Sequence, residues 1–133
     1  MKKAALILLV VVAVKCYGQS RLGYTEDKIK SEFSTKEWKD KLSKKGERII
    51  YFDDTTQGHY MYYINDSSKL CDFCVYYPLT AALLNGFVEQ YNKNYVIVSS
   101  KKWKCYMQGS EDIVVITLFT EDGWSYFSYW FEK

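Results

Sequence analysis

Short segments rich in aromatic and β-branched residues, separated by turn-forming residues, follow one another through most of this chain. Segments of this composition favour β-strands. The clearest connection between two of them is Asp122-Gly123, because both residues tolerate the positive φ angles of a two-residue hairpin turn. Strands joined by hairpins run antiparallel, so the sequence predicts a mostly antiparallel sheet.

The first expected helix lies in the N-terminal third of the chain. It begins after Thr25, whose side chain can cap it, and it ends near Phe33. Trp38 and Leu42 are one helical turn apart, so helical character is expected to continue or restart through residues 36–44.

A second, central helix is expected over residues 79–91. Pro78 fits its first turn, and its broad apolar stripe is expected to pack on one face of the sheet. The expected strands cover residues 48–52, 59–64 and 70–77 before this helix, and 95–98, 103–107, 113–119 and 124–131 as three or four strands after it. The sequence therefore predicts an α+β fold with a helix-strand-strand-strand-helix-strand-strand-strand order.

The size and composition of the chain fit one globular domain. It has 133 residues, of which 48% are hydrophobic and 26% are charged. Its aromatic share of 18% is too high for a chain that stays unfolded, which excludes the disordered class.

The first eighteen residues have the pattern of a secretory signal peptide. Lys2 and Lys3 precede an apolar run over residues 4–14, and a more polar stretch ends at Gly18. The run is shorter than the roughly 20 apolar residues of a membrane span, so no transmembrane segment is expected. Cleavage after Gly18 leaves residues 19–133 as a single exported α+β domain, periplasmic or secreted.

Cys16 is the residue that a lipoprotein signal would modify. A bacterial lipobox has a small residue before the cysteine, whereas Lys15 is bulky and charged, so a lipoprotein is the less favoured outcome. Removal of residues 1–18 lowers Lys+Arg from 18 to 15 and leaves Asp+Glu at 16, so the formal net charge changes from +2 to −1. Acidic residues interrupt the lysine-rich stretch over residues 36–48, which predicts an exposed surface and no nucleic-acid partner.

The string Cys71-Asp72-Phe73-Cys74 is the closest match to a named chemical motif. A CxxC pair is redox-active when its first thiol lies at a helix N-terminus. On a regular strand, the two Cα atoms are about 10 Å apart and the side chains leave opposite faces, so Cys71 and Cys74 are predicted not to bond to each other. Either of them can instead pair with Cys105 in an oxidising compartment. A thiol-dependent redox protein using Cys71 and Cys74 stays the alternative function.

The sequence predicts no catalytic residue, metal or cofactor. His59 is the only histidine, and no recognised nucleophile motif accompanies it. Three cysteines with His59 do not have the usual spacing of a zinc site. The acidic pairs fall at predicted turns, where turn chemistry explains them.

The aromatic residues are the remaining candidates for function. Tyr60 and Tyr62 share a face of one expected strand, and Trp124, Tyr126 and Trp130 share a face of the last one. Tyr and Trp are enriched at recognition surfaces. We expect these five residues to line one face of the sheet and to bind a protein or glycan partner; in the alternative, this face lies under the central helix and the residues are core. The predicted function is a non-catalytic binding module.

Four stretches also carry a resemblance to other proteins. They are residues 62–66 (YYIND), 71–78 (CDFCVYYP), 92–96 (NKNYV) and 103–106 (WKCY). The chain resembles small exported proteins of unassigned function in Bacteroidetes-type bacteria, which implies a bacterial envelope or secreted location and brings no catalytic residues. Its helix-plus-antiparallel-sheet order is similar to that of β-lactamase-inhibitor-like domains, a likeness that implies the fold alone.

Overall fold

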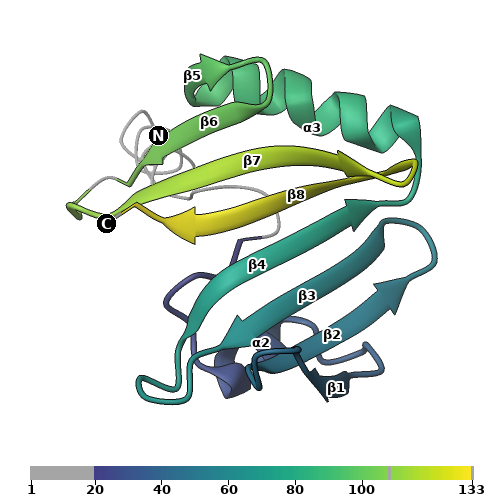
Figure 1. The fold of residues 1–133 in the computed structure, drawn as a ribbon, viewed down its shortest axis with the longest axis vertical. Coiled ribbons are helices and arrows are strands. Elements are labelled where there is room, and N and C mark those ends of the chain that lie inside the picture. Colours follow the sequence, from purple (N-terminus) through teal and green to yellow (C-terminus); the bar gives the residue numbers. More distant parts are fainter. Residues whose placement is uncertain (1–19, 108, 133) are drawn as a thin grey trace, which may run out of the picture.

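The computed structural model describes residues 20–107 and 109–132. They form one antiparallel sheet in the order β1-β2-β3-β4-β8-β7-β6-β5, with two helices (Figure 1). The elements are α2 (Glu26–Glu32), β1 (Lys39–Leu42), β2 (Arg48–Asp54), β3 (Gly58–Ile64), β4 (Cys71–Pro78), α3 (Ala81–Asn94), β5 (Val96–Ser99), β6 (Lys102–Tyr106), β7 (Ile113–Glu121) and β8 (Trp124–Phe131). The predicted signal peptide, its cleavage site and Cys16 lie outside the described residues.

The sheet consists of two four-stranded meanders that meet in its middle. One contains β1 to β4 and follows α2, and the other contains β5 to β8 and follows α3. They join where β4 pairs with β8, from Phe73 opposite Trp130 to Tyr76 opposite Phe127. Every strand pair is antiparallel, which confirms the antiparallel sheet. Figure 1 shows α3 leading from the end of β4 to the far edge of the sheet, where β5 begins.

The predicted α+β class, with three strands after each helix, is wrong. The fold is dominated by one eight-stranded sheet with two short helices, and four strands follow each helix. The missed strand is β1, which lies within the predicted helical stretch over residues 36–44. Lys39 to Leu42 pair with Tyr51 to Arg48 of β2, and these cross-strand hydrogen bonds override the weak helical spacing of an exposed segment.

The central helix begins later than the sequence predicted. Pro78 is the last residue of β4, and the helix is capped by Thr80, whose side-chain oxygen accepts a hydrogen bond from the backbone N–H of Leu83 at 3.2 Å. A side-chain cap satisfies one of the free N–H groups of the first turn, which proline cannot do. The helix therefore runs from Ala81 to Asn94.

Both helices pack against the same face of the sheet, which we call the core face. Ile29 of α2 is fully buried there, and Phe33 lies against the same cluster. From α3, Leu84, Phe87 and Tyr91 pack on it. The sheet residues of this cluster are Ile50, Phe52, Tyr60, Tyr62, Ile64, Cys71, Cys74, Tyr76, Trp103, Cys105, Val114, Ile116, Phe127 and Tyr129. Side chains alternate along each strand, so the residues between them form the opposite, open face.

Neither helix in the described part of the chain is both long and apolar enough to cross a membrane. α3, the longer of the two, has 14 residues, whereas a span takes about 20.

The turn between β2 and β3 is organised by the carboxylate of Asp54. Its oxygens accept hydrogen bonds from the Nζ of Lys36 at 2.7 Å and from the backbone N–H and hydroxyl of Thr56 at 2.8 and 2.6 Å. The bond from Lys36, followed by those from Thr56, holds the pKa of Asp54 well below its ordinary value. The charged carboxylate is therefore the form that supports this turn.

Because the pKa of Asp54 is lowered by folding, its charge stabilises the protein above the ordinary carboxyl pKa of about 3.9. That contribution is lost as the pH falls through the lowered value. We expect the free energy of unfolding of the wild type to fall more steeply than that of Asp54→Asn between about pH 4 and about pH 2. Denaturant titrations along this pH series measure the difference, and Asp66→Asn, at an exposed position, is the control that should keep the wild-type slope. Equal slopes for wild type and Asp54→Asn would contradict the assignment.

Candidate functional site

The open face of the sheet carries two groups of contacting aromatic side chains. The ring of Tyr77 on β4 lies 4.9 Å from that of Tyr126 on β8, and Tyr126 stacks on Phe119 at 5.3 Å. Phe73 and Trp130 form a second stacked pair, with ring centroids 6.5 Å apart. In the part of the chain that the structure describes, no helix packs on this face.

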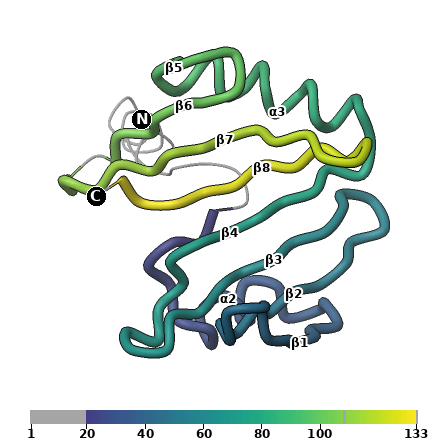
Figure 2. Tube along the Cα trace, viewed as in Figure 1, coloured from purple at the N-terminus to yellow at the C-terminus, as the bar shows by residue number. Residues whose placement is uncertain are grey.

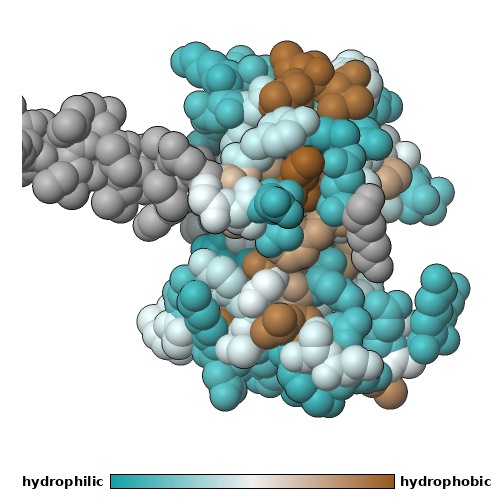
Figure 3. Space-filling view, turned by 90° about the vertical axis from the view of Figure 1, so that its left-hand side faces the viewer, coloured by the Kyte–Doolittle hydropathy of each residue, from teal (hydrophilic) through white to brown (hydrophobic). Residues whose placement is uncertain are grey.

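Small residues of the open face are buried between these rings. Ile49, Val75, Val115 and Ser128 are each less than a tenth exposed, although they belong to the face without helices. The large neighbouring side chains therefore cover the middle of the face themselves. In Figure 3, apolar residues are visible at the narrow middle of the molecule and in a larger patch at its upper end.

A shallow pocket of about 400 Å³ lies on the open face. Its lining residues come from β1, β2, β3, β4 and the start of β8, and they are Lys41, Tyr51, Asp53, His59, Met61, Tyr77 and Trp124. Aromatic and apolar surfaces thus meet a carboxylate, an imidazole and an ammonium group in one concave site. This combination is typical of a ligand-binding pocket.

Trp124 owes its position in this pocket to the tight turn before β8. Asp122 and Gly123 have φ angles of +50° and +80°, as the predicted two-residue hairpin requires. Trp124 is the first residue after the turn and pairs with Glu121. Its side chain is 64% exposed, which is unusual for tryptophan and leaves its apolar surface available for contact.

The polar part of the pocket centres on Asp53 and His59, which are opposite each other on β2 and β3. The Nδ1–H of His59 donates to Oδ1 of Asp53, and the Nζ of Lys39 lies 3.7 Å from Oδ2. The hydrogen bond from His59 is the main cause that lowers the pKa of Asp53. On the other side of the pocket, the Nζ of Lys41 lies 5.0 Å from the centre of the Tyr51 ring. The site therefore offers a charged acceptor and a cationic donor beside aromatic surface.

The predicted binding residues do not share one face. Trp124, Tyr126 and Trp130 lie on the open face as a set, whereas Tyr60 and Tyr62 lie on the core face and are 4% and 1% exposed. Tyr60 stacks between Phe52 and Tyr76, with ring centroids 4.7 and 4.8 Å away. The expectation of a single face is wrong for Tyr60 and Tyr62, which are core residues. Only Trp124 of the five lines the pocket.

The geometry predicted for the CxxC string is also wrong. Ile64 pairs with Cys71 but Tyr63 pairs with Phe73, so Asp72 is an extra residue in a β-bulge. The bulge brings Cys71 and Cys74 onto the core face together, with their Sγ atoms 3.5 Å apart. The predicted arrangement, with the two side chains on opposite faces about 10 Å apart, therefore does not hold, and both thiols are reduced in the structure.

The surroundings of this thiol pair oppose a catalytic role. Cys71 and Cys74 are each 1% exposed, and burial raises the pKa of Cys74 well above its ordinary value. A reactive cysteine needs an accessible thiolate with a lowered pKa. His59 lies on the other face of the sheet, and the described residues contain no cluster of three metal-ligating side chains.

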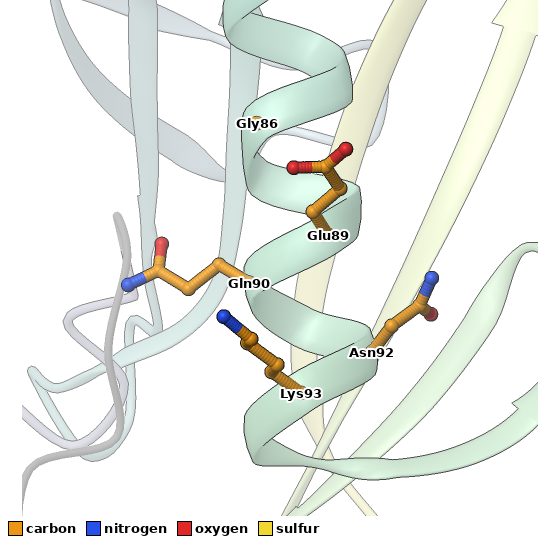
Figure 4. Close-up of a pocket in the computed structure, with 5 residues that line it drawn as sticks. All are labelled: Gly86, Glu89, Gln90, Asn92 and Lys93. Carbon is orange, nitrogen blue, oxygen red and sulfur yellow. The ribbon is translucent and has the colours of Figure 1, made fainter.

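A second pocket, of about 480 Å³, lies along α3. Its described lining residues, Gly86, Glu89, Gln90, Asn92 and Lys93, all come from this one helix. Figure 4 shows Gln90 and Asn92 pointing to opposite sides of the helix. Asn92 is already used by the fold, because its Oδ1 accepts a hydrogen bond from Nε1 of Trp103 at 2.8 Å. These side chains do not converge on a ligand, so we place the candidate site on the open face.

Most residues of the open-face pocket were missed by the sequence analysis. Lys41, Tyr51, Met61 and Tyr77 carry no local motif, because they come together only through the pairing of four strands. One signal was available for Asp53 and His59: the predicted hairpin between residues 48–52 and 59–64 brings the two ends next to each other.

The chain matches no family model, no curated protein and no solved structure. The resemblance to small exported proteins of Bacteroidetes-type bacteria therefore stays a prediction, and the function is argued from the geometry of the open face.

Proposed function

We propose that this protein is an exported, non-catalytic binding module that holds a carbohydrate in the open-face pocket. The observation that carries the proposal is the pocket itself, where the exposed indole of Trp124 and the ring of Tyr77 stand beside the hydrogen-bonded pair of Asp53 and His59. Its volume of about 400 Å³ falls in the range of ligand sites.

A carbohydrate fits both kinds of surface in this pocket. Each sugar ring has an apolar face of C–H groups, which packs on the flat apolar surface of Trp and Tyr. Each hydroxyl both donates and accepts hydrogen bonds, so it can donate to the carboxylate of Asp53 and accept from the ammonium group of Lys41. A purely apolar ligand would leave these charged groups without partners, at a cost in binding free energy.

Export is supported by the first eighteen residues. Lys2 and Lys3 followed by the apolar run over residues 4–14 have the order of a secretory signal peptide. An exported protein meets the polysaccharides of the cell surface and its surroundings, which are ligands of the proposed class. Whether the protein stays in the periplasm or is secreted does not change the chemistry of the site.

The proposal predicts that Trp124→Ala removes most of the binding. Titration calorimetry with a panel of soluble neutral and acidic oligosaccharides identifies a probe that binds the wild type. For that probe, we expect Trp124→Ala to weaken the affinity at least about tenfold, because the indole supplies the largest apolar contact area in the pocket.

The matched control is Tyr106→Ala. Tyr106 is an aromatic residue of the open face that is 59% exposed and does not line the pocket. We expect it to keep the wild-type affinity. Failure of every oligosaccharide to bind the wild type, or equal affinities for wild type and Trp124→Ala, would overturn the proposal.

A further inference from the structure

The β-bulge at the start of β4 has a consequence for the chemistry of its two cysteines. Residues that face one another across paired strands share a face of the sheet. Cys71 is opposite Ile64 and Cys74 is opposite Tyr62, and Ile64 and Tyr62 both point into the core. The extra residue, Asp72, is exposed and accepts a hydrogen bond from Nδ2 of Asn65 at 3.0 Å. This bond holds the bulge in the arrangement that puts both sulfur atoms on the core face.

The two sulfur atoms lie at van der Waals contact and face each other. Their separation is 3.5 Å, and a disulfide bond is about 2.05 Å long. The two sulfur atoms therefore have to approach by only about 1.5 Å for the bond to form. Outside the bulge, a CxxC pair on a strand does not reach this geometry.

The third cysteine in the described part of the chain, Cys105, is too far away to form a disulfide with Cys71 or Cys74. Cys105 lies on β6, and β8 and β7 separate that strand from β4. Three strand spacings of about 4.8 Å give roughly 14 Å, whereas a disulfide needs Cα atoms within about 7 Å. The sequence-based expectation that Cys105 pairs with Cys71 or Cys74 is therefore wrong.

We propose that Cys71 and Cys74 form a structural disulfide that closes the β-bulge of β4 when the chain folds in the presence of a disulfide oxidant. One cysteine loses its proton to solvent and, as its thiolate, attacks a low-molecular-weight disulfide such as oxidised glutathione. This forms a mixed disulfide and releases one glutathione thiolate, which takes up a proton from solvent. The second protein thiol loses its proton and displaces the other glutathione. The protein gains one S–S bond and loses two hydrogen atoms, and the oxidant becomes two thiols.

The burial of the pair determines when this exchange takes place. Both thiols are covered in the folded protein, and burial raises the pKa of Cys74, so the folded thiols react slowly. The bond therefore forms during folding, before α2 and α3 cover the core face, and the folded protein then protects it from reductants.

The bond fixes the segment that precedes α2. The backbone N–H of Cys71 donates to the carbonyl of Tyr24, and the N–H of Gly23 donates to the carbonyl of Cys71, both at 2.8 Å. The N–H of Arg21 donates to Sγ of Cys74 at 3.4 Å. Figure 2 shows this purple segment running beside the start of β4. A covalent link between the two cysteines holds three of its anchoring contacts together.

Tryptic peptides test the proposal directly, because the four cysteines fall in three different peptides. Trypsin cleaves after Lys69 and Lys93, which leaves Cys71 and Cys74 in one peptide. Cleavage after Lys104 places Cys105 in another peptide, and Cys16 falls in a third, after Lys15. The full chain is unfolded, refolded in a buffer of reduced and oxidised glutathione, unfolded again in denaturant without reductant, alkylated there with iodoacetamide and digested.

We expect the peptide of residues 70–93 to carry no alkyl group and to be lighter by two hydrogen atoms, whereas Cys105 is alkylated. Two alkyl groups on this peptide, or its attachment to the peptide of Cys105 or Cys16, would overturn the proposal.

A second measurement is the midpoint of thermal unfolding. Refolding in reductant should lower it for the wild type and for Cys105→Ala, but not for Cys74→Ala; a wild-type midpoint that does not depend on the redox buffer would contradict the structural role.

Discussion

Replacement of Gly58 by alanine is expected to lower the free energy of unfolding by about 3 kcal/mol or more. Gly58 begins β3 with a φ of +129°, a backbone angle that residues other than glycine rarely adopt. A Cβ atom at this position would lie 1.9 Å from the carbonyl oxygen of Tyr77 and 2.9 Å from the backbone nitrogen of Leu79. Both atoms belong to the backbone of the paired strand and its continuation, so relief of the clash requires β3 and β4 to separate.

Gly86→Ala is the matched control for this substitution. Gly86 lies in α3, and a Cβ atom built on it meets no other atom within 4 Å. Alanine is a better helix former than glycine, so we expect the free energy of unfolding to rise by about 0.5–1 kcal/mol. Denaturant titration of both variants measures the two changes. A loss at Gly58 no larger than about 1 kcal/mol would show that β3 and β4 are not packed as closely as described.

Trp103→Ala is expected to cost about 3–5 kcal/mol of the free energy of unfolding. Trp103 is fully buried on β6, between the sheet and α3. Its ring lies 5.6 Å from that of Tyr91 and 6.3 Å from that of Phe127. Its Nε1–H donates to Oδ1 of Asn92 at 2.8 Å, so the substitution removes a hydrogen bond as well as the largest side chain of the core.

Trp124→Ala is the control for Trp103→Ala, because it makes the same change on the exposed side of the sheet. We expect its free energy of unfolding to stay within about 0.5 kcal/mol of the wild type. The pair also separates the two interpretations of the aromatic residues of β8. Equal losses of stability for Trp103→Ala and Trp124→Ala would make Trp124 a core residue and would remove the basis of the open-face pocket.

The sequence predicted the elements whose signals are local. The hairpin between β7 and β8 follows from Asp122-Gly123, because few residues other than these adopt two successive positive φ angles. The alternation along β8 also holds: Phe127 and Tyr129 are core, whereas Trp124 and Tyr126 lie on the open face. In both cases, the deciding interactions are within one strand or between neighbours in sequence.

The errors concern interactions between distant segments. β1 was predicted as helix because Trp38 and Leu42 have helical spacing, and only pairing with β2 makes residues 39–42 a strand. Tyr60 and Tyr62 were assigned to the face of Trp124, because the sequence does not show how β3 is aligned with β8 through β4. A shift of one residue in that alignment moves every side chain to the opposite face.

The sequence by itself determined that the chain forms hairpin-linked antiparallel strands, where its tightest turn lies, and which residues alternate along each strand. Those properties depend on backbone preferences and on the two-residue period of a strand. Only the tertiary structure decided which face the helices cover, that a bulge at Asp72 brings Cys71 and Cys74 together, and that Asp53, His59, Tyr77 and Trp124 meet in one pocket. These properties depend on the register in which strands far apart in sequence pair and on which of their side chains are buried. The physical cause is that the apolar faces of all elements must be buried in one shared core.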